Sequence, residues 1–264
     1  MNFKKIILYR EPAISEINID ALVVFLQENF PIKVDIKDNV FKEFSLENIK
    51  KLSNIRITDI KSSFSEHMSS DDEIEFERKL CEDSSLMDST TKVENAQQIS
   101  DVFMYDGFEL QKILRYLSED SETLHIILTN RLTCTFDEND NRYHGRAVIC
   151  ANPSIISTTG IVEAPAKPKE YYFEVMKLKT QGLDIKSAKE KYKGKFLEYN
   201  DKRLTKILEG YILQVIFYNI TGESFCEDIE CRLNNAHWQK DLLFSQLEIS
   251  KLCKKHNEIL TNLN

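Results

Sequence analysis

Three cysteines and a histidine near the C-terminal end have the residue types and the spacing of a metal site. Cys226, Cys231, Cys253 and His256 form the pattern C-x4-C-x21-C-x2-H within 31 residues. Zinc binds thiolates and neutral imidazoles in a tetrahedral shell, which two close ligand pairs joined by a helical spacer can complete. Four side chains leave no position for a water molecule. We therefore predict one structural Zn²⁺ that stabilises the C-terminal part of the fold.

Two other interpretations of these four residues stay open at this point. In the first, Cys226 and Cys231 are buried thiols and His256 is a surface residue near a frayed chain end. In the second, the cysteines are redox-active, although C-x4-C and C-x2-H differ from the C-x-x-C redox motif. We favour the metal site because the first pair follows Gly222, a natural helix end, and the second pair has the tight spacing of ligands.

The same stretch carries a family resemblance. Residues 216–233, IFYNITGESFCEDIECRL, and the later CKKH at 253–256 resemble the archaemetzincins, zinc metallopeptidases of the metzincin clan. In that family H-E-x-x-H-x-x-G-x-x-H runs into C-x4-C-x-M and later C-x-x-C. The matched positions are the motif glycine (Gly222), the paired cysteines (Cys226, Cys231), the methionine (here Leu233) and the closing pair (Cys253, His256). Weaker similarity covers 124–132, and uncharacterised archaeal metallopeptidase-like proteins look similar around 160–172 and 231–239.

The catalytic positions of the family motif are the ones that differ. The three zinc-binding histidines fall on Val215, Asn219 and Phe225, and the general-base glutamate falls on Ile216. Aliphatic and phenyl side chains have no lone pair for a metal, and an amide oxygen is a poor zinc ligand. The resemblance therefore implies a metallopeptidase-like pseudoenzyme that keeps a structural zinc, lacks the catalytic one, and binds or scaffolds a protein or peptide partner.

An active hydrolase with a rebuilt site is the alternative. Its candidate residues are His144, His237 and Glu209, followed by His125, Glu163, Arg131 and Arg142, and no spacing among them dictates a mechanism. Each also has a simpler interpretation. His237 lies beside the only tryptophan and can have a capping or packing role, and His125, in an apolar strand, can be a core histidine. His144 can lie in an exposed turn. Glu209 can be a solvent-facing helix residue near Lys206.

The pattern of apolar residues predicts the elements that position these groups. Strands are expected at 4–9, 32–37, 54–60 and 124–130, with a hairpin over 132–150 that turns at DENDN (137–141). Helices are expected at 19–30, 46–52, 106–117, 169–179, 201–221 and 236–249, and a proline-containing connector at 160–168. Because residues 211–218 are almost wholly apolar, the fifth of these helices is predicted to be buried on all sides.

These elements indicate a mixed α/β (α+β) fold. The β-α-β opening predicts parallel strands and the hairpin antiparallel ones, which suits a metzincin-like mixed twisted sheet with packed helices. We divide the chain into an N-terminal β-α-β part (1–62), an acidic flexible insertion (63–100), the remainder of the α/β domain (101–199) and a C-terminal helical zinc-binding subdomain (200–264).

Composition restricts the partners. The net charge is −8, with nine acidic against three basic residues between 67 and 98, so the basic surface that phosphate backbones require is not expected. No apolar run approaches a membrane span, and the N-terminus lacks a secretory pattern. We expect a cytoplasmic protein that binds neither nucleic acid nor membrane, in which Cys134 and Cys150 are buried strand thiols and Cys81 lies in the acidic insertion.

Overall fold

A mostly parallel sheet forms the centre of the computed structural model, which describes residues 3–11, 16–64, 67–86 and 102–262. Within these residues the sheet has the strand order β2-β1-β4-β8-β7. The strands are β1 (Lys5–Arg10), β2 (Lys33–Lys37), β4 (Thr123–Thr129), β7 (Val148–Ile149) and β8 (Ser154–Ser157). All neighbours are parallel except β7, which runs antiparallel to β8 at the edge. The mixed α/β fold class is thus confirmed.

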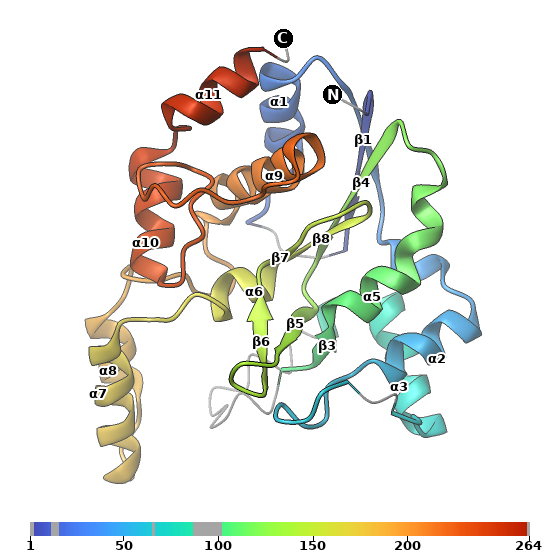
Figure 1. The fold of residues 1–264 in the computed structure, drawn as a ribbon. Coiled ribbons are helices and arrows are strands. Elements are labelled where there is room, and N and C mark those ends of the chain that lie inside the picture. The colour runs from blue at the N-terminus through green and yellow to red at the C-terminus, as the bar shows by residue number, and fades with distance from the viewer. Residues whose placement is uncertain (1–2, 12–15, 65–66, 87–101, 263–264) are drawn as a thin grey trace.

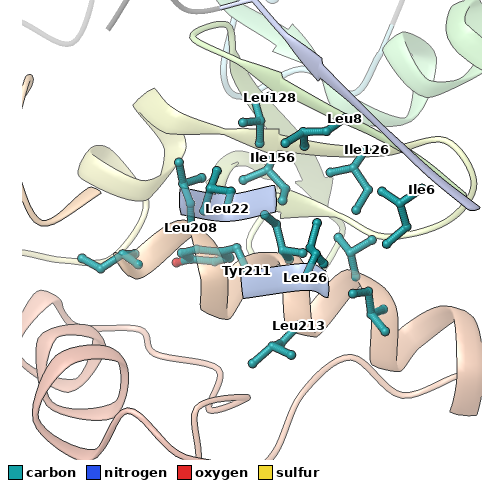
Figure 2. Close-up of a cluster of buried hydrophobic side chains, with 14 of the residues drawn as sticks. Ile6, Leu8, Leu22, Leu26, Ile126, Leu128, Ile156, Leu208, Tyr211 and Leu213 are labelled. Atoms are coloured by element: carbon teal, nitrogen blue, oxygen red, sulfur yellow. The ribbon is translucent and has the colours of Figure 1, made fainter. Parts of the chain in front are cut away.

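Alternating side chains of the central strands enter two different cores. Ile6 and Leu8 of β1 point to one face, where they meet α1 (Ile19–Asn29) and α9 (Leu204–Thr221). Figure 2 shows these strand residues facing Leu22 and Leu26 of α1, with Tyr211 of α9 close by. The intervening residues of the strands point to the opposite face. Both faces are covered because parallel strands need crossover helices.

The second face of the sheet is covered by short helices from the first half of the chain. They are η1 (Val40–Glu43), α2 (Leu46–Asn54), α3 (Asp71–Glu82), α5 (Gly107–Leu114) and η3 (Arg115–Glu119). Figure 1 shows α2, α3 and α5 on the side of the sheet away from α1 and α9. Predicted caps are present, since Asn18, Ser45 and Asp106 each accept a backbone N–H in the first turn of α1, α2 and α5.

A second, smaller sheet carries the predicted hairpin only as far as residue 146, because β7, at the end of the predicted range, belongs to the first sheet. In the described residues the order of the second sheet is β3-β5-β6, with β3 (Met104–Asp106), β5 (Leu132–Asp137) and β6 (Arg142–Arg146). β5 and β6 are antiparallel and pair from Thr133 with Arg146 to Asp137 with Arg142. The period of two therefore places Arg142, His144 and Arg146 on one side of β6 and Tyr143 and Gly145 on the other.

The helix predicted to be buried is α9. Its residues from Ile207 to Phe217 are all buried, and Gly222 follows in the left-handed conformation with φ of 81°. Leucine, isoleucine and phenylalanine surround this helix because the sheet and α1 cover one side and the C-terminal segments cover the other. Those segments are α10 (Gln239–Leu243), the π-helical segment η4 (Phe244–Ile249) and α11 (Lys254–Thr261).

Three local expectations differ from the structure. The segment 71–82, where no element was predicted, is α3, with a Ser70 capping box and buried Leu80 and Cys81. The strand expected at 54–60 is a single bridge from Arg56 to Tyr105. Residues Thr158–Glu163 form helix α6 instead of belonging to the connector. The part of the predicted insertion at 87–100 lies outside the described residues, and the four-part division of the chain stays a prediction.

Two further helices form a hairpin that projects from the rest of the fold. They are α7 (Lys169–Thr180), close to its predicted range, and α8 (Lys186–Lys191), shown at the lower left of Figure 1. The hairpin has its own small apolar cluster of Tyr171, Ala188, Tyr192 and Phe196.

Candidate metal centre and adjacent cleft

The four predicted metal ligands come together at the C-terminal end of α9. Gly222 ends that helix, and the following loop carries Cys226, which is held to the chain near Leu233 by a 2.9 Å backbone hydrogen bond. Cys253 is the N-cap residue of α11, and His256 lies in the first turn of that helix. The π-helical segment η4 ends at Ser250 in the left-handed region, which turns the chain towards Cys253.

The geometry of this cluster fits a tetrahedral cation. One donor atom of each residue lies within 4.8 Å of all the others. Nδ1 of His256 is 3.0 Å from Sγ of Cys253 and 3.6 Å from Sγ of Cys231. In a tetrahedral zinc site the ligand atoms are roughly 3.5 to 3.8 Å apart, as follows from bond lengths of about 2.0 to 2.3 Å. The cluster therefore needs only small adjustments to hold such an ion.

The electrostatics of the cluster also favour a bound cation. Burial raises the pKa of Cys231 to about 12 and raises the pKa of Cys226, although backbone N–H groups of Asp228, Leu233 and Cys253 contact the two sulfurs. Burial lowers the pKa of His256, which keeps the imidazole in the neutral form that binds metals. Clustered thiols and a neutral imidazole become a stable anionic ligand set only when a cation supplies the opposite charge.

One of the simpler interpretations of these residues is wrong. His256 was the surface residue of that interpretation, but only 3% of it is exposed, and its ring packs edge-on against Phe217 of α9 at 5.4 Å. Cys231 is fully buried in the same core. The cluster thus fastens the last helix to the central one.

The positions of the catalytic motif form no second metal site in the described residues. Val215 and Ile216 are fully buried in the core between α9 and the sheet. Asn219 donates its amide to the backbone oxygens of Val215 at 2.9 Å and Ala151 at 3.3 Å. Phe225 is 41% exposed and offers no donor.

A cleft of about 400 Å³ lies beside the candidate metal centre. Its walls come from β6 and β7, from the start of the connector after α6, from α9, and from the segment before α10. They include the apolar residues Phe108, Ile149 and Phe225 and the polar residues His144, Arg146, Gln214 and His237. The size falls within the range of about 300 to 1,000 Å³ that is common for ligand pockets.

The structure brings two of the three rebuilt-site candidates together and separates the third. His144 and His237 both line the cleft. Glu209 is not among its lining residues; it is buried and bonded to Arg232 at 2.8 Å and Lys206 at 2.7 Å, so its interpretation as a solvent-facing residue is wrong. His237 is exposed and caps no helix, because α10 begins at Gln239 without a side-chain cap.

The other sequence candidates have structural partners. His125 is a core histidine, as predicted, and its Nδ1 lies 3.0 Å from the Tyr9 hydroxyl. Arg131 is fully buried and paired with Glu11 and Glu77. Arg142 lies 3.9 Å from Asp140, and the carboxylate of Glu163 accepts a hydrogen bond from Tyr199 and pairs with Lys167.

The remaining cysteines differ in their surroundings. Cys134 is a buried strand thiol, as predicted, and Cys81 is buried in α3. Cys150 was expected to be of the same kind but follows β7, is half-buried and lines the cleft.

Arg146 and Gln214 are lining residues that the sequence analysis missed. The sequence contains only weak signals for these two residues. Arg146 shares the period of two with His144 on β6, and Gln214 is the one amide in an otherwise apolar stretch of α9. Neither is close in sequence to the other.

Comparison with known proteins assigns the chain to a family. The family model described as "Probable metallopeptidase family (DUF6775)" matches residues 2–263, nearly the whole chain. The protein belongs to this family. No curated protein and no solved structure matches the chain.

Membership in the probable metallopeptidase family agrees with the metallopeptidase-like resemblance and with a possible Cys₃His metal site. None of the described helices combines the length and the apolar character needed to cross a membrane.

Proposed function

We propose that the protein is a non-catalytic, archaemetzincin-like, peptide-binding member of its family whose C-terminal part is held by one structural zinc ion. One contrast carries the proposal. Four soft donors lie within 4.8 Å of one another at Cys226, Cys231, Cys253 and His256. The catalytic motif positions on and after α9 instead carry valine, isoleucine, asparagine and phenylalanine.

Zinc is the proposed ion because of the donor set. Three sulfurs and one imidazole nitrogen in a closed arrangement suit Zn²⁺, whereas Mg²⁺ and Ca²⁺ require oxygen ligands. When bound, the ion would fix the loop after α9 to the first turn of α11. With all four positions occupied by side chains, it would not activate water.

The cleft is the proposed binding site for an extended peptide. β7 is the edge strand of its sheet in the described residues, so one side of its backbone has no strand partner. An extended peptide can pair with such an edge through main-chain hydrogen bonds while its side chains enter flanking pockets. Phe108, Ile149 and Phe225 supply apolar surface for these side chains.

A rebuilt hydrolase is the second candidate, and one observation favours it. His144 lines the cleft, and its Nε2 lies 2.8 Å from Asp140, an arrangement that could orient the imidazole as a general base. His237 lies on the same cleft. This candidate requires that His144→Gln abolish a measurable hydrolytic activity while the protein stays folded and keeps its metal.

Metal analysis combined with peptide assays tests the proposal. Purified protein should contain about one zinc per chain, bind extended peptides, and leave them uncleaved. Two zinc ions per chain with chelator-sensitive cleavage would overturn the non-catalytic proposal. Cleavage lost in His144→Gln would favour the rebuilt hydrolase. Thiol labelling that is unchanged by chelation would argue against any metal and for free cysteines.

We also propose a cytoplasmic location, because cysteines that form no disulfide suit a reducing compartment.

A further inference from the structure

Arg146 lacks the acidic partner that most arginines of this protein have. Seven of the nine arginines form an ion pair with a carboxylate. Within the described residues Arg146 forms no ion pair within 4.0 Å; Asp137 is the acid whose pKa its charge helps to lower, without a direct contact. The Arg146 Nε donates to Oγ1 of Thr135 at 2.6 Å, which fixes the plane of the guanidinium, and no described residue accepts from its two terminal nitrogens.

No acidic residue among those described lines the cleft itself, and the nearby acids are Asp140, which pairs with His144, and Asp137. The lining differs in this respect from the chain as a whole, which has 43 acidic residues and a net charge of −8. The lining residues with a basic side chain are Arg146, His144 and His237. A ligand carboxylate would therefore find in Arg146 a cation that no direct ion pair with a described residue occupies.

The same cleft contains an unsatisfied acceptor on α9. Gln214 is 2% exposed and lines the cleft, and its Nε2 donates to the backbone oxygen of Asn234 at 3.3 Å. Its Oε1 is buried and receives no hydrogen bond from any described residue. A buried acceptor without a donor is unfavourable, so an N–H supplied by a ligand would be stabilising. A planar guanidinium and an amide oxygen in the same cleft match a carboxylate and a peptide N–H.

We propose that Arg146 anchors a carboxylate of the peptide bound along β7, and that Gln214 Oε1 accepts a neighbouring backbone N–H. The preferred ligand is thus an extended peptide with an apolar residue next to a carboxylate. That carboxylate belongs either to an acidic side chain or to a free C-terminus. This inference rests on the proposed peptide-binding function and adds its specificity.

Four fluorescein-labelled peptides measured by fluorescence anisotropy test the inference and separate the two carboxylate sources. The first pair is Ala-Leu-Phe-Glu-Ala amide and its Gln isostere. The second pair is Ala-Leu-Phe-Ala with a free or an amidated C-terminus. The zinc-loaded full chain should bind one carboxylate peptide roughly ten-fold more tightly than its neutral partner, because a bidentate arginine contact is charge-assisted. The pair that shows the difference identifies the source.

Three variants locate the effect. Arg146→Gln should remove the ten-fold preference of the carboxylate peptide over its neutral partner. Arg146→Lys keeps the charge but not the two-pronged guanidinium, so it should keep part of the preference. Arg142→Gln is the matched control, because Arg142 lies on the same side of β6 but not in the cleft, and it should keep the full preference. Gln214→Leu should weaken carboxylate and neutral peptides alike.

The outcomes distinguish this inference from the function on which it rests. If no peptide binds to the folded, zinc-loaded protein, the proposed peptide-binding function fails. If all four peptides bind with equal affinity, or if Arg146→Gln keeps the preference while Arg142→Gln loses it, the specificity assigned to Arg146 is wrong and peptide binding stands. Melting temperatures equal to that of the unaltered protein show that the variants are folded.

Discussion

Loss of the metal from the Cys₃His cluster is expected to lower the free energy of unfolding by about 3 to 4 kcal/mol. An ion that binds only the folded chain contributes about 2.7 kcal/mol at a free concentration 100-fold above its Kd and about 4.1 kcal/mol at 1,000-fold. The structure supports selective binding to the folded state, because the donors come from the loop after α9 and from the start of α11 and are spread over 31 residues. Cys231 and His256 are buried against the core as well.

Thermal unfolding with and without EDTA measures this contribution. In a chain of this size each 1 kcal/mol shifts the melting temperature by about 2 to 4 °C, so the chelator should lower it by about 6 to 16 °C. The Cys226→Ser variant should have this lowered melting temperature even without EDTA, and EDTA should change it little. Cys134→Ser is the matched control, since Cys134 is also a buried thiol but lies in β5 outside the cluster. That variant should keep the full response to EDTA.

Two results would refute this reasoning. The first is a melting temperature of the unaltered, zinc-containing protein that EDTA leaves unchanged although the metal is removed. The second is a Cys226→Ser variant that responds to EDTA as strongly as Cys134→Ser. Either result would mean that the cluster does not couple metal binding to folding.

Three further predictions concern the core. Glu77→Ala is expected to cost about 3 to 5 kcal/mol in urea unfolding, because it leaves the fully buried Arg131 short of a carboxylate. Gly210→Ala should cost about 1 to 3 kcal/mol in the same assay, because the added methyl group would overlap the buried amide of Gln246. Burial lowers the pKa of His125 from 6.5, so the unfolded chain takes up the proton more readily. Stability should therefore fall as the pH drops below about 6.5, until the folded-state pKa is passed, and less steeply in His125→Gln.

Each of these predictions has a matched variant. Glu75→Ala removes an exposed acid from the same helix as Glu77 and should leave stability unchanged within error. Gly145→Ala adds a methyl group that meets only ordinary contacts at 3.5 Å or more and should be tolerated better than Gly210→Ala. Tyr9→Phe removes the hydrogen bond to His125 but keeps the imidazole, so the pH dependence should persist. Equal effects within any pair would contradict the corresponding prediction.

The features that could be predicted from the sequence are the ones whose causes are local. Asn18, Ser45 and Asp106 cap helices with their own following backbone N–H groups, so a short window of sequence contains both partners. Gly222 ends α9 for an equally local reason, its positive φ. The two ligand pairs of the candidate metal cluster are each short, and the spacer between them contains α10 and η4, close to the predicted helix, so their spacing was enough to predict that the four residues lie together.

The features that could not be predicted depend on partners far apart in sequence. Helix α3 has an acidic, weakly periodic sequence, and its buried face includes Glu77, which is stable there because Arg56 and Arg131 reach it from other elements. The cleft is a similar case, since Arg146 and Gln214 belong to different elements that only the folded chain brings to one site. Propensity and periodicity carry no information about such pairings.

Helix α9 explains why the catalytic positions would not return by simple substitution. Val215 and Ile216 are fully buried in the core between the sheet and the C-terminal segments and have no contact with water. Val215→His and Ile216→Glu would each bury a polar group with no partner, at a cost of about 1 to 3 kcal/mol for the imidazole and more for the carboxylate. Together these costs approach the 5 to 15 kcal/mol that stabilises a typical domain. A catalytic zinc site at these positions would thus require α9 to pack differently, whereas the Cys₃His cluster needs only small adjustments to hold an ion. This difference supports the proposed function, in which the structural centre is present without a catalytic one.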